Sequence, residues 1–214
     1  DGYVLTIGNS GTHVMNAGLY KNLSYDPIRD FAAVAQIVTS PLLLVTSSNF
    51  APMTVQETIA LAKSKSLNFG GPGATGNLAS QLFNQMAGVN IVVIPFKGSN
   101  AAEVAILQGE IQLLFSSIGG AIPFLASGKM RALAVTSLHR LPQYPNVPTL
   151  DESGLKGYEM DFWIGLFAPA ATPKEVVARI NQDIAHVSTQ PDLKEKYNAM
   201  GYSVVGEPPE RFSA

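Results

Sequence analysis

The sequence contains no cysteine and few charged residues. Among its 214 residues there is no Cys, which excludes disulfides, thiolate nucleophiles and cysteine metal ligands. Charged residues make up 14% of the chain, against roughly 25% in typical soluble proteins. The net charge of −2 offers no electrostatic basis for binding nucleic acid or an anionic membrane. The lack of cysteine suits an exported protein.

Uninterrupted apolar runs of membrane-spanning length are also missing. The charge-free run from Phe31 to Gln56 is broken by Thr39-Ser40-Pro41 and Ser47-Ser48-Asn49, so it predicts two strands and not a membrane span. No signal-peptide pattern is present. An apolar strand from Tyr3 to Gly8 starts almost at once, and Pro208-Pro209-Glu210 announces a helix that the chain does not complete. We expect further elements upstream, so that the first lobe described below is incomplete.

Groups that perform catalysis are scarce. The three histidines, His13, His139 and His186, fall on different predicted elements and have no metal-ligand spacing. No Gly-x-Ser-x-Gly motif exposes a serine nucleophile. Only His13 lies beside a candidate binding loop. We therefore expect a binding protein without cofactor or metal, and not an enzyme.

A strand–helix rhythm runs through the chain and predicts an α/β fold with a mostly parallel sheet. Helix starts are marked by a capping box at Thr54 to Glu57, by the same spacing at Asn100 to Glu103, and by Thr172-Pro173-Lys174-Glu175. The apolar strands are expected at residues 3–8, 34–38, 42–45, 67–70, 91–95, 111–115, 132–135 and 159–168.

A glycine-rich stretch from Leu67 to Phe83 organises the chain. A short strand enters a segment with four glycines, and a helix follows with Asn77 or Gly76 as the expected N-cap. Backbone N–H groups at the positive end of a helix dipole form a ready anion site. No charged residue occurs from Ser66 to Phe96, so neutral donors would hold the anion. The alternative is a plain βα turn, and neither phosphate-loop motif is present.

Other polar segments leave two interpretations open. Asn9 to His13 follows the first strand and is either a second binding loop or a set of N-cap hydrogen bonds. Lys97 is either a ligand contact or a solvated lysine. Trp163 is either a core residue or one wall of a ligand cleft.

Several stretches together resemble the solute-binding receptors of tripartite tricarboxylate transporters, the Bug-type receptors. The similarity runs essentially end to end. The stretches that carry it are 1–3, 41–45, 70–76, 95–99, 109–115, 128–137, 147–150, 154–155 and 165–173.

The resemblance implies a two-lobed periplasmic receptor of the Venus flytrap type, which closes around a small mono-, di- or tricarboxylate. The lobes would be 1–45 with 165–214, and 46–164. It also implies a monomer that delivers its ligand to a membrane permease. The ligand-binding positions transferred from the family are Ser10, Thr12, His13, Gly73, Ala74, Thr75, Gly76, Asn77, Lys97, Gly98, Ser99, Ser116 and Ser117.

One departure from the family bears on the ligand. Relatives often carry an acidic residue after the strand that ends at Phe115, where this chain has Ser116-Ser117. An ammonium group would need that charge, so we expect a ligand without an amino group. The alternatives are the effector domain of a transcription regulator, an enzyme acting on a carboxylate, and a receptor that senses without transport.

Overall fold

The computed structural model describes residues 4–19 and 21–207 and divides the chain into two compact units. Unit 1 comprises residues 1–40 and 162–214, and unit 2 comprises residues 41–161. The two units divide at 40/41 and 161/162, whereas the lobes expected from the sequence divide at 45/46 and 164/165. Two expectations lie outside the described residues: the strand start at Tyr3 and the helix start at 208–210.

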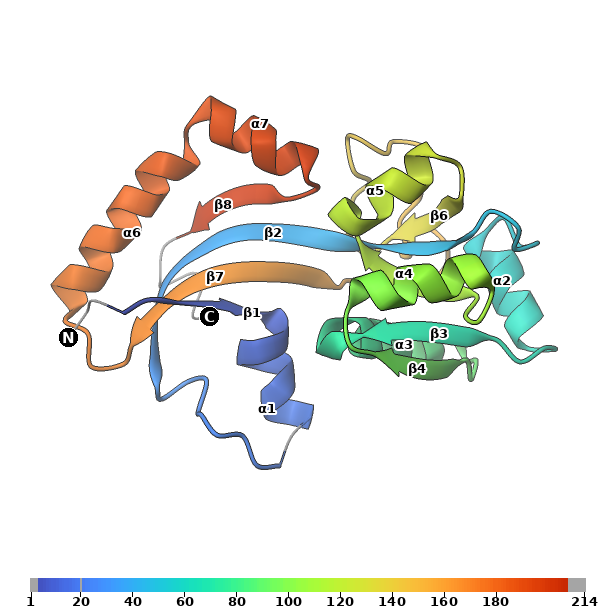
Figure 1. Ribbon diagram of the computed structural model, residues 1–214, viewed down its shortest axis with the longest axis horizontal. Helices are drawn as coiled ribbons and strands as arrows, with labels where there is room; N and C mark the ends of the chain where they lie inside the picture. Colours follow the sequence, from blue (N-terminus) through green and yellow to red (C-terminus); the bar gives the residue numbers. More distant parts are fainter. Residues whose placement is uncertain (1–3, 20, 208–214) are drawn as a thin grey trace. The chain divides into compact units, whose positions relative to one another are not determined.

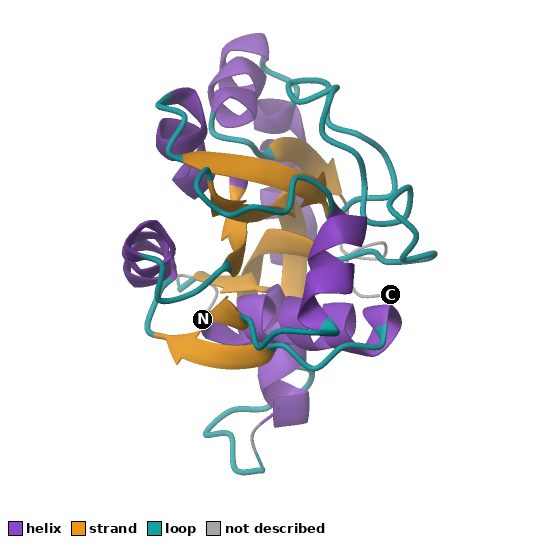
Figure 2. Ribbon diagram, turned by 90° about the vertical axis from the view of Figure 1, so that its right-hand side faces the viewer, coloured by secondary structure: helices purple, strands orange, loops and turns teal. Residues whose placement is uncertain are grey.

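Unit 2 is built on a mixed sheet flanked by helices (Figures 1 and 2). Its strands lie in the order β6-β2-β5-β3-β4, in which β3 pairs in parallel with both β4 and β5. The elements of unit 2 are the end of β2 (Phe31–Ser47), α2 (Val55–Ala62), β3 (Asn68–Pro72), α3 (Gly73–Ala87), β4 (Val92–Phe96), α4 (Ser99–Gln108), β5 (Leu113–Ser117), α5 (Ile118–Ala126) and β6 (Met130–Val135).

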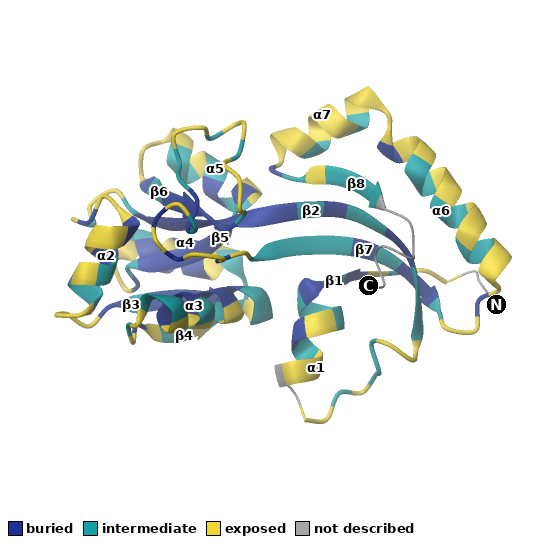
Figure 3. Cartoon of the chain, turned by 180° about the vertical axis from the view of Figure 1, so that it is seen from behind, coloured by how far each residue is buried: buried dark blue, intermediate teal, exposed yellow. Residues whose placement is uncertain are grey.

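The two faces of this sheet carry separate apolar cores because strand side chains alternate between faces. On one face, Ala102 and Ile106 of α4 pack with Leu114 and other aliphatic residues. On the other, Phe69, Phe83 and Phe115 form an aromatic cluster, with Phe115 stacked on Tyr158. Residues 41–46 of β2 and residues 113–116 of β5 are accordingly buried (Figure 3).

Unit 1 contains a smaller sheet. Its elements are β1 (Thr6–Asn9), the π-helix η1 (Gly11–Met15), α1 (Asn16–Leu19), the start of β2, β7 (Asp161–Pro169), α6 (Lys174–Ser188), α7 (Pro191–Ala199) and β8 (Ser203–Glu207). The strand β7 lies between β1 and β2, and β8 pairs with β2. Both α6 and α7 contact β8, and their outer faces are exposed (Figure 3).

The strand β2 is one long strand where the sequence predicts two. The change of partners occurs at Ser40-Pro41: β8 pairs as far as Thr39, and β5 and β6 pair from Leu42 onward. Ser40 Oγ donates to Gly201 O (2.8 Å), and Leu42 N–H donates to Thr136 Oγ1 (2.7 Å). Pro41, which has no N–H to donate, therefore stands where the pairing changes and does not break the strand.

The expectation of a mostly parallel sheet in each lobe is wrong for unit 1. There β1 pairs antiparallel with β7, and β2 pairs antiparallel with β8. In unit 2, β2 is also antiparallel to β5 and β6. Apolar runs identify buried strands but carry no information on pairing direction, which depends on partners distant in sequence.

The helix starts predicted from the sequence agree with the structure at α2 and differ from it at α6. The capping box at Thr54 is confirmed: Glu57 N–H donates to Thr54 Oγ1 (3.1 Å), and Met53 N–H donates to Glu57 Oε2 (2.7 Å). In contrast, α6 has Pro173 as its N-cap, and Thr172 Oγ1 has no hydrogen-bond partner among the described residues.

Candidate functional site

Three strand-to-helix turns meet at one edge of unit 2. The parallel strands β5, β3 and β4 are neighbours, with Gly70 opposite both Leu114 and Ile94. Because the carboxyl ends of parallel strands lie at the same edge of a sheet, this pairing collects the turns that lead into α3, α4 and α5. We call residues 72–77, 96–99 and 116–118 the carboxyl edge. It contains ten of the candidate residues: Gly73, Ala74, Thr75, Gly76, Asn77, Lys97, Gly98, Ser99, Ser116 and Ser117.

The turn into α3 is tighter than the sequence suggests. The N-cap is Pro72, so the expectation of Gly76 or Asn77 is wrong, and no side chain caps the helix. Gly73 takes φ +64°, a conformation that favours glycine, and its Cα faces open space. Ala74 and Thr75 are half-buried, and the first turn contains no acidic residue. The positive end of α3 is therefore uncapped and open at the surface of its unit.

The glycines permit this turn by allowing close packing. A Cβ on Gly76 would lie 2.6 Å from Cδ of Pro72, so glycine lets the proline ring lie against the helix. A Cβ on Gly71 would collide with Oδ1 of Asn77, whose Nδ2 donates to Gly73 O (2.8 Å). Asn77 thus holds the strand-to-helix turn together from inside the first turn.

The turn into α4 places Lys97 at the same edge. Lys97 is exposed, Gly98 is the N-cap with φ +147°, and Ser99 is the first helical residue. No side chain caps α4, so the capping box expected from Asn100 to Glu103 is wrong. Glu103 instead lies inside the unit, where it is 5% exposed.

The turn into α5 is internally capped. Ser117 is the N-cap, and its Oγ accepts from Gly120 N–H (3.2 Å). Ser116 is fully buried, and its hydroxyl donates to Glu103 Oε1 (3.1 Å). A carboxylate therefore stands beside Ser116, although residues 116 and 117 are not acidic themselves. The pattern of residues missed Glu103 because its spacing from Asn100 imitates a capping box.

In unit 1, the polar segment after β1 is helical and internally hydrogen-bonded. Asn9 N–H donates to Thr12 Oγ1 (3.0 Å), and Thr12 N–H donates to Asn9 Oδ1 (3.0 Å), which is a reciprocal capping arrangement. Ser10 is buried, and its Oγ has no hydrogen-bond partner among the described residues. Of the two sequence interpretations, the N-cap arrangement describes Thr12, while Ser10 keeps a free hydroxyl.

His13 belongs to an aromatic cluster. Its ring is stacked on Phe167 with centroids 4.0 Å apart, and it meets Phe31 edge-on at 5.0 Å. Burial lowers the pKa of His13 below its ordinary value, which favours the neutral ring. His13 and Trp163 both line a cavity of about 200 Å³ in unit 1. The other histidines, His139 and His186, are exposed.

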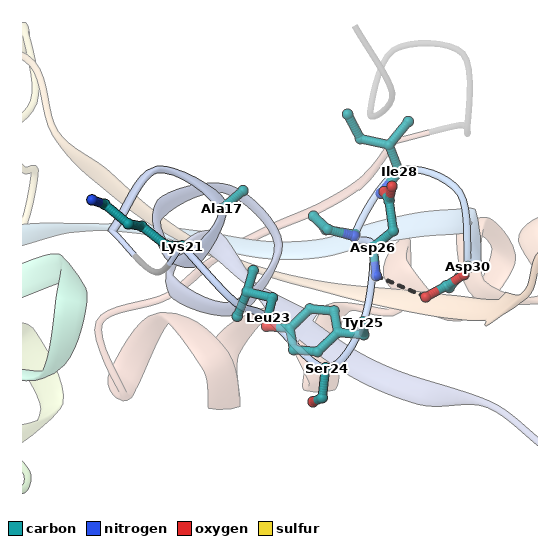
Figure 4. A pocket seen from close by; sticks show the side chains of 9 residues that line it. Ala17, Lys21, Leu23, Ser24, Tyr25, Asp26, Ile28 and Asp30 are labelled. Carbon is teal, nitrogen blue, oxygen red and sulfur yellow. Dashed lines mark hydrogen bonds between the residues drawn. The ribbon is translucent and has the colours of Figure 1, made fainter.

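A wider hollow of about 550 Å³ lies between α1 and the segment 23–30 (Figure 4). Asp26 dominates its chemistry: the N–H groups of Arg29 and Ile28 donate to its carboxylate and lower its pKa. Asp26 N–H also donates to Asp30 Oδ2 (2.7 Å), shown dashed in Figure 4. These bonds describe a structural turn, and the hollow holds none of the candidate residues.

Residues 4–19 and 21–207 contain neither a metal-ligand cluster nor a membrane-spanning helix. No group of three His, Cys, Asp or Glu side chains in this part is placed to hold a metal ion. None of its helices combines the length and apolar character needed to cross a bilayer.

Comparison with known proteins identifies the family. The profile described as "Tripartite tricarboxylate transporter family receptor" matches residues 1–209. A Pseudomonas protein encoded in the tcbD-tcbE intergenic region is 34% identical, over 98% of this chain and 64% of that protein. The chain spans 59% to 64% of the length of three such curated relatives.

Solved structures agree with this assignment. An R. palustris protein with adipate has a TM-score of 0.93 and 32% identity, over 100% of this chain and 73% of its own. MatC from Rhodopseudomonas palustris with bound malate has a TM-score of 0.84 and 32% identity, over 95% and 71%. The periplasmic binding protein BugD has a TM-score of 0.86 and 30% identity, over 98% and 72%. Matched in sequence along nearly its whole length and in fold to these structures, the chain belongs to the receptor family of the tripartite tricarboxylate transporters, in its Bug-type branch.

Proposed function

We propose that this chain forms the ligand-binding part of a periplasmic receptor that captures a small organic carboxylate for a tripartite tricarboxylate-type transporter. The observation that carries this proposal is the N-terminus of α3, which has no side-chain cap and no acidic residue in its first turn. In this proposal the two units are the two lobes of the receptor, and the receptor is a monomer.

The first turn of α3 supplies the chemistry for holding a carboxylate. The N–H groups of Gly73, Ala74 and Thr75 are among the first donors of the helix, which have no acceptor within it. A ligand carboxylate accepts these hydrogen bonds and interacts favourably with the positive end of the helix dipole. The exposed ammonium group of Lys97, on the same carboxyl edge, adds attraction that salt screens.

The candidate residues of unit 1 would make a different kind of contact with the ligand. The hydroxyl of Ser10 is buried, has no hydrogen-bond partner in residues 4–19 and 21–207, and is available to a ligand oxygen. His13 and Trp163 contribute aromatic surface, because the lowered pKa of His13 keeps its ring neutral. A neutral aromatic wall suits the carbon chain of an organic acid better than it suits a second charge.

Relatives support the ligand class. The R. palustris structure was solved with adipate, and MatC was solved with malate. Both ligands are small organic acids whose carboxylates need hydrogen-bond donors. The receptor role also implies that the ligand is released chemically unchanged into a membrane permease.

Titration calorimetry of the full-length protein tests the proposal. The panel contains hexanoate, adipate, succinate, malate and citrate, with glucose and putrescine, neither of which has a carboxylate, as controls outside the class. We expect saturable binding of at least one carboxylate, and its recovery unchanged by NMR. Binding of no acid in the panel contradicts the receptor proposal, and chemical conversion of a bound acid replaces it with an enzyme. Cells that lack the permease genes of the transporter should bind the same acid outside the cytoplasm but not accumulate it.

A further inference from the structure

Glu103 places a buried carboxylate against the first turn of α5. The hydroxyl of Ser116 donates to its Oε1 (3.1 Å), and a Cβ on Gly120 would collide with the same oxygen. Glycine at position 120 therefore lets the carboxylate lie against the helix. Glu103 is 5% exposed and Ser116 is 0% exposed, so both groups are removed from bulk water.

No cation compensates this carboxylate within the part of the chain that the structure describes. The ion pairs there join Arg29 to Asp26, Arg140 to Glu152, Lys156 to Asp151, and Arg179 to Asp183. Burying an unpaired carboxylate is costly, whereas an apolar side chain would fit beside Ala102 and Ile106 without that cost. The hydrogen bond from Ser116 and the positive end of α5 offset part of this cost.

The three turns of the carboxyl edge differ in their charge. The helices α3 and α4 begin without a side-chain cap and without an acidic residue in the first turn. The helix α5 begins with a Ser117 cap and has the Glu103 carboxylate against its first turn. The strands β3 and β5 are adjacent and parallel, so the N-termini of α3 and α5 lie at the same edge of the sheet. The N-terminus of α3 is open, and that of α5 has the Glu103 carboxylate against it.

We propose that Glu103 is a specificity-determining residue that keeps the Ser116–Ser117 turn negative. The turn into α3 then receives the single carboxylate of the ligand, and the turn into α5 disfavours a second one. The ligand class is an organic acid whose other end is a neutral donor or an ammonium group, in place of the ligand without an amino group that we expected from Ser116-Ser117. This inference rests on the proposed function, because it concerns the ligand of the same site.

Because Glu103 would act through its charge, the affinity of the protein should depend on the charge of the ligand's second end group. Two matched series of probes vary one end group at constant chain length: hexanoate, adipate and 6-aminohexanoate, and butanoate, succinate and 4-aminobutanoate. In the wild-type protein, the amino acid of the preferred length binds more tightly than the dicarboxylate. In Glu103→Gln, which keeps the shape and a hydrogen-bond acceptor for Ser116, the ratio of dicarboxylate to amino-acid affinity rises by about tenfold.

Two further variants serve as a control for net charge and as a second test of position 103. Glu110→Gln removes one negative charge from an exposed position of the same unit and should leave the ratio unchanged. Glu103→Met removes the charge and leaves no acceptor for Ser116, and it should raise the ratio as Glu103→Gln does. If one of the two variants fails to fold, the other still provides the measurement. A ratio that stays within twofold of wild type in the folded Glu103 variant overturns the inference while leaving the receptor proposal intact. Absence of binding by every acid to the wild-type protein overturns the proposed function and the inference with it.

Discussion

The imidazole ring of His13 lies flat against the phenyl ring of Phe167, with centroids 4.0 Å apart and planes 15° from parallel. The same ring covers Gly8, where any Cβ would collide with it. His13 thus joins the end of β1 to β7 as an aromatic residue, in addition to any contact with a ligand.

His13 should make the stability of the protein depend on pH. Burial lowers the pKa of the folded His13 below 6.5. Below pH 6.5 the unfolded chain therefore binds a proton that the folded chain resists. Stability should fall as the pH drops from 6.5 through the folded pKa and then level off. Urea unfolding between pH 5 and pH 8 measures this, and His13→Phe should weaken the dependence.

The aromatic role of His13 predicts a ranking of variants. We expect His13→Ala to lower the free energy of unfolding by about 2 kcal/mol, and His13→Phe to keep most of it, because the second variant retains the stack on Phe167. Equal destabilisation by the two variants would contradict the aromatic role.

Gly71 and Asn77 should be coupled in stability. In Gly71→Ala the new Cβ collides with Oδ1 of Asn77 and lies 2.8 Å from Cγ1 of Val93, so we expect a cost of about 1–3 kcal/mol. The double variant Gly71→Ala/Asn77→Ala should recover part of this cost. Thermal or urea unfolding of the four proteins gives the coupling energy, and strict additivity would show that Asn77 is not the obstacle.

An acidic residue in the first turn of α3 should raise stability and weaken binding. Thr75→Glu places a carboxylate at the positive helix end, which we expect to stabilise the unit by about 0.5 kcal/mol. It also competes with the ligand, so affinity for the best carboxylate should fall by roughly tenfold. Gln81→Glu, at an exposed position further along the helix, adds the same charge as a control. Equal effects of the two variants on affinity would count against binding at the N-terminus of α3.

A bulky residue at Gly76 should abolish binding. Gly76→Val forces the ring of Pro72 away from the helix, because even a Cβ lies 2.6 Å from Cδ of that ring. The turn that presents the N–H groups is then displaced. Gly18→Val is the matched control, since a Cβ there meets no atom within 4 Å. Circular dichroism should show both variants folded, and wild-type affinity in Gly76→Val would refute the role of this turn.

Sequence patterns predicted the helix starts correctly where hydrogen bonds between residues close in sequence determine the start. The capping box at Thr54 forms because Thr54 and Glu57 lie within one turn of each other. The glycine run marked the turn into α3, but its helix begins at Gly73 and not near Asn77. That shift arises because Gly71 and Gly76 pack against Asn77 and Pro72, contacts that a list of glycines does not reveal.

The sequence by itself determined an α/β chain with a charge-free strand, turn and helix, scarce catalytic groups, and an end-to-end likeness to one receptor family. These features depend on residue types and on spacings within one element. Only the tertiary structure decided the pairing directions of β1, β2, β7 and β8, and the place of Glu103. The reason is physical: the partner of Glu103 is Ser116, 13 residues away on another element, and no local pattern records which elements fold together.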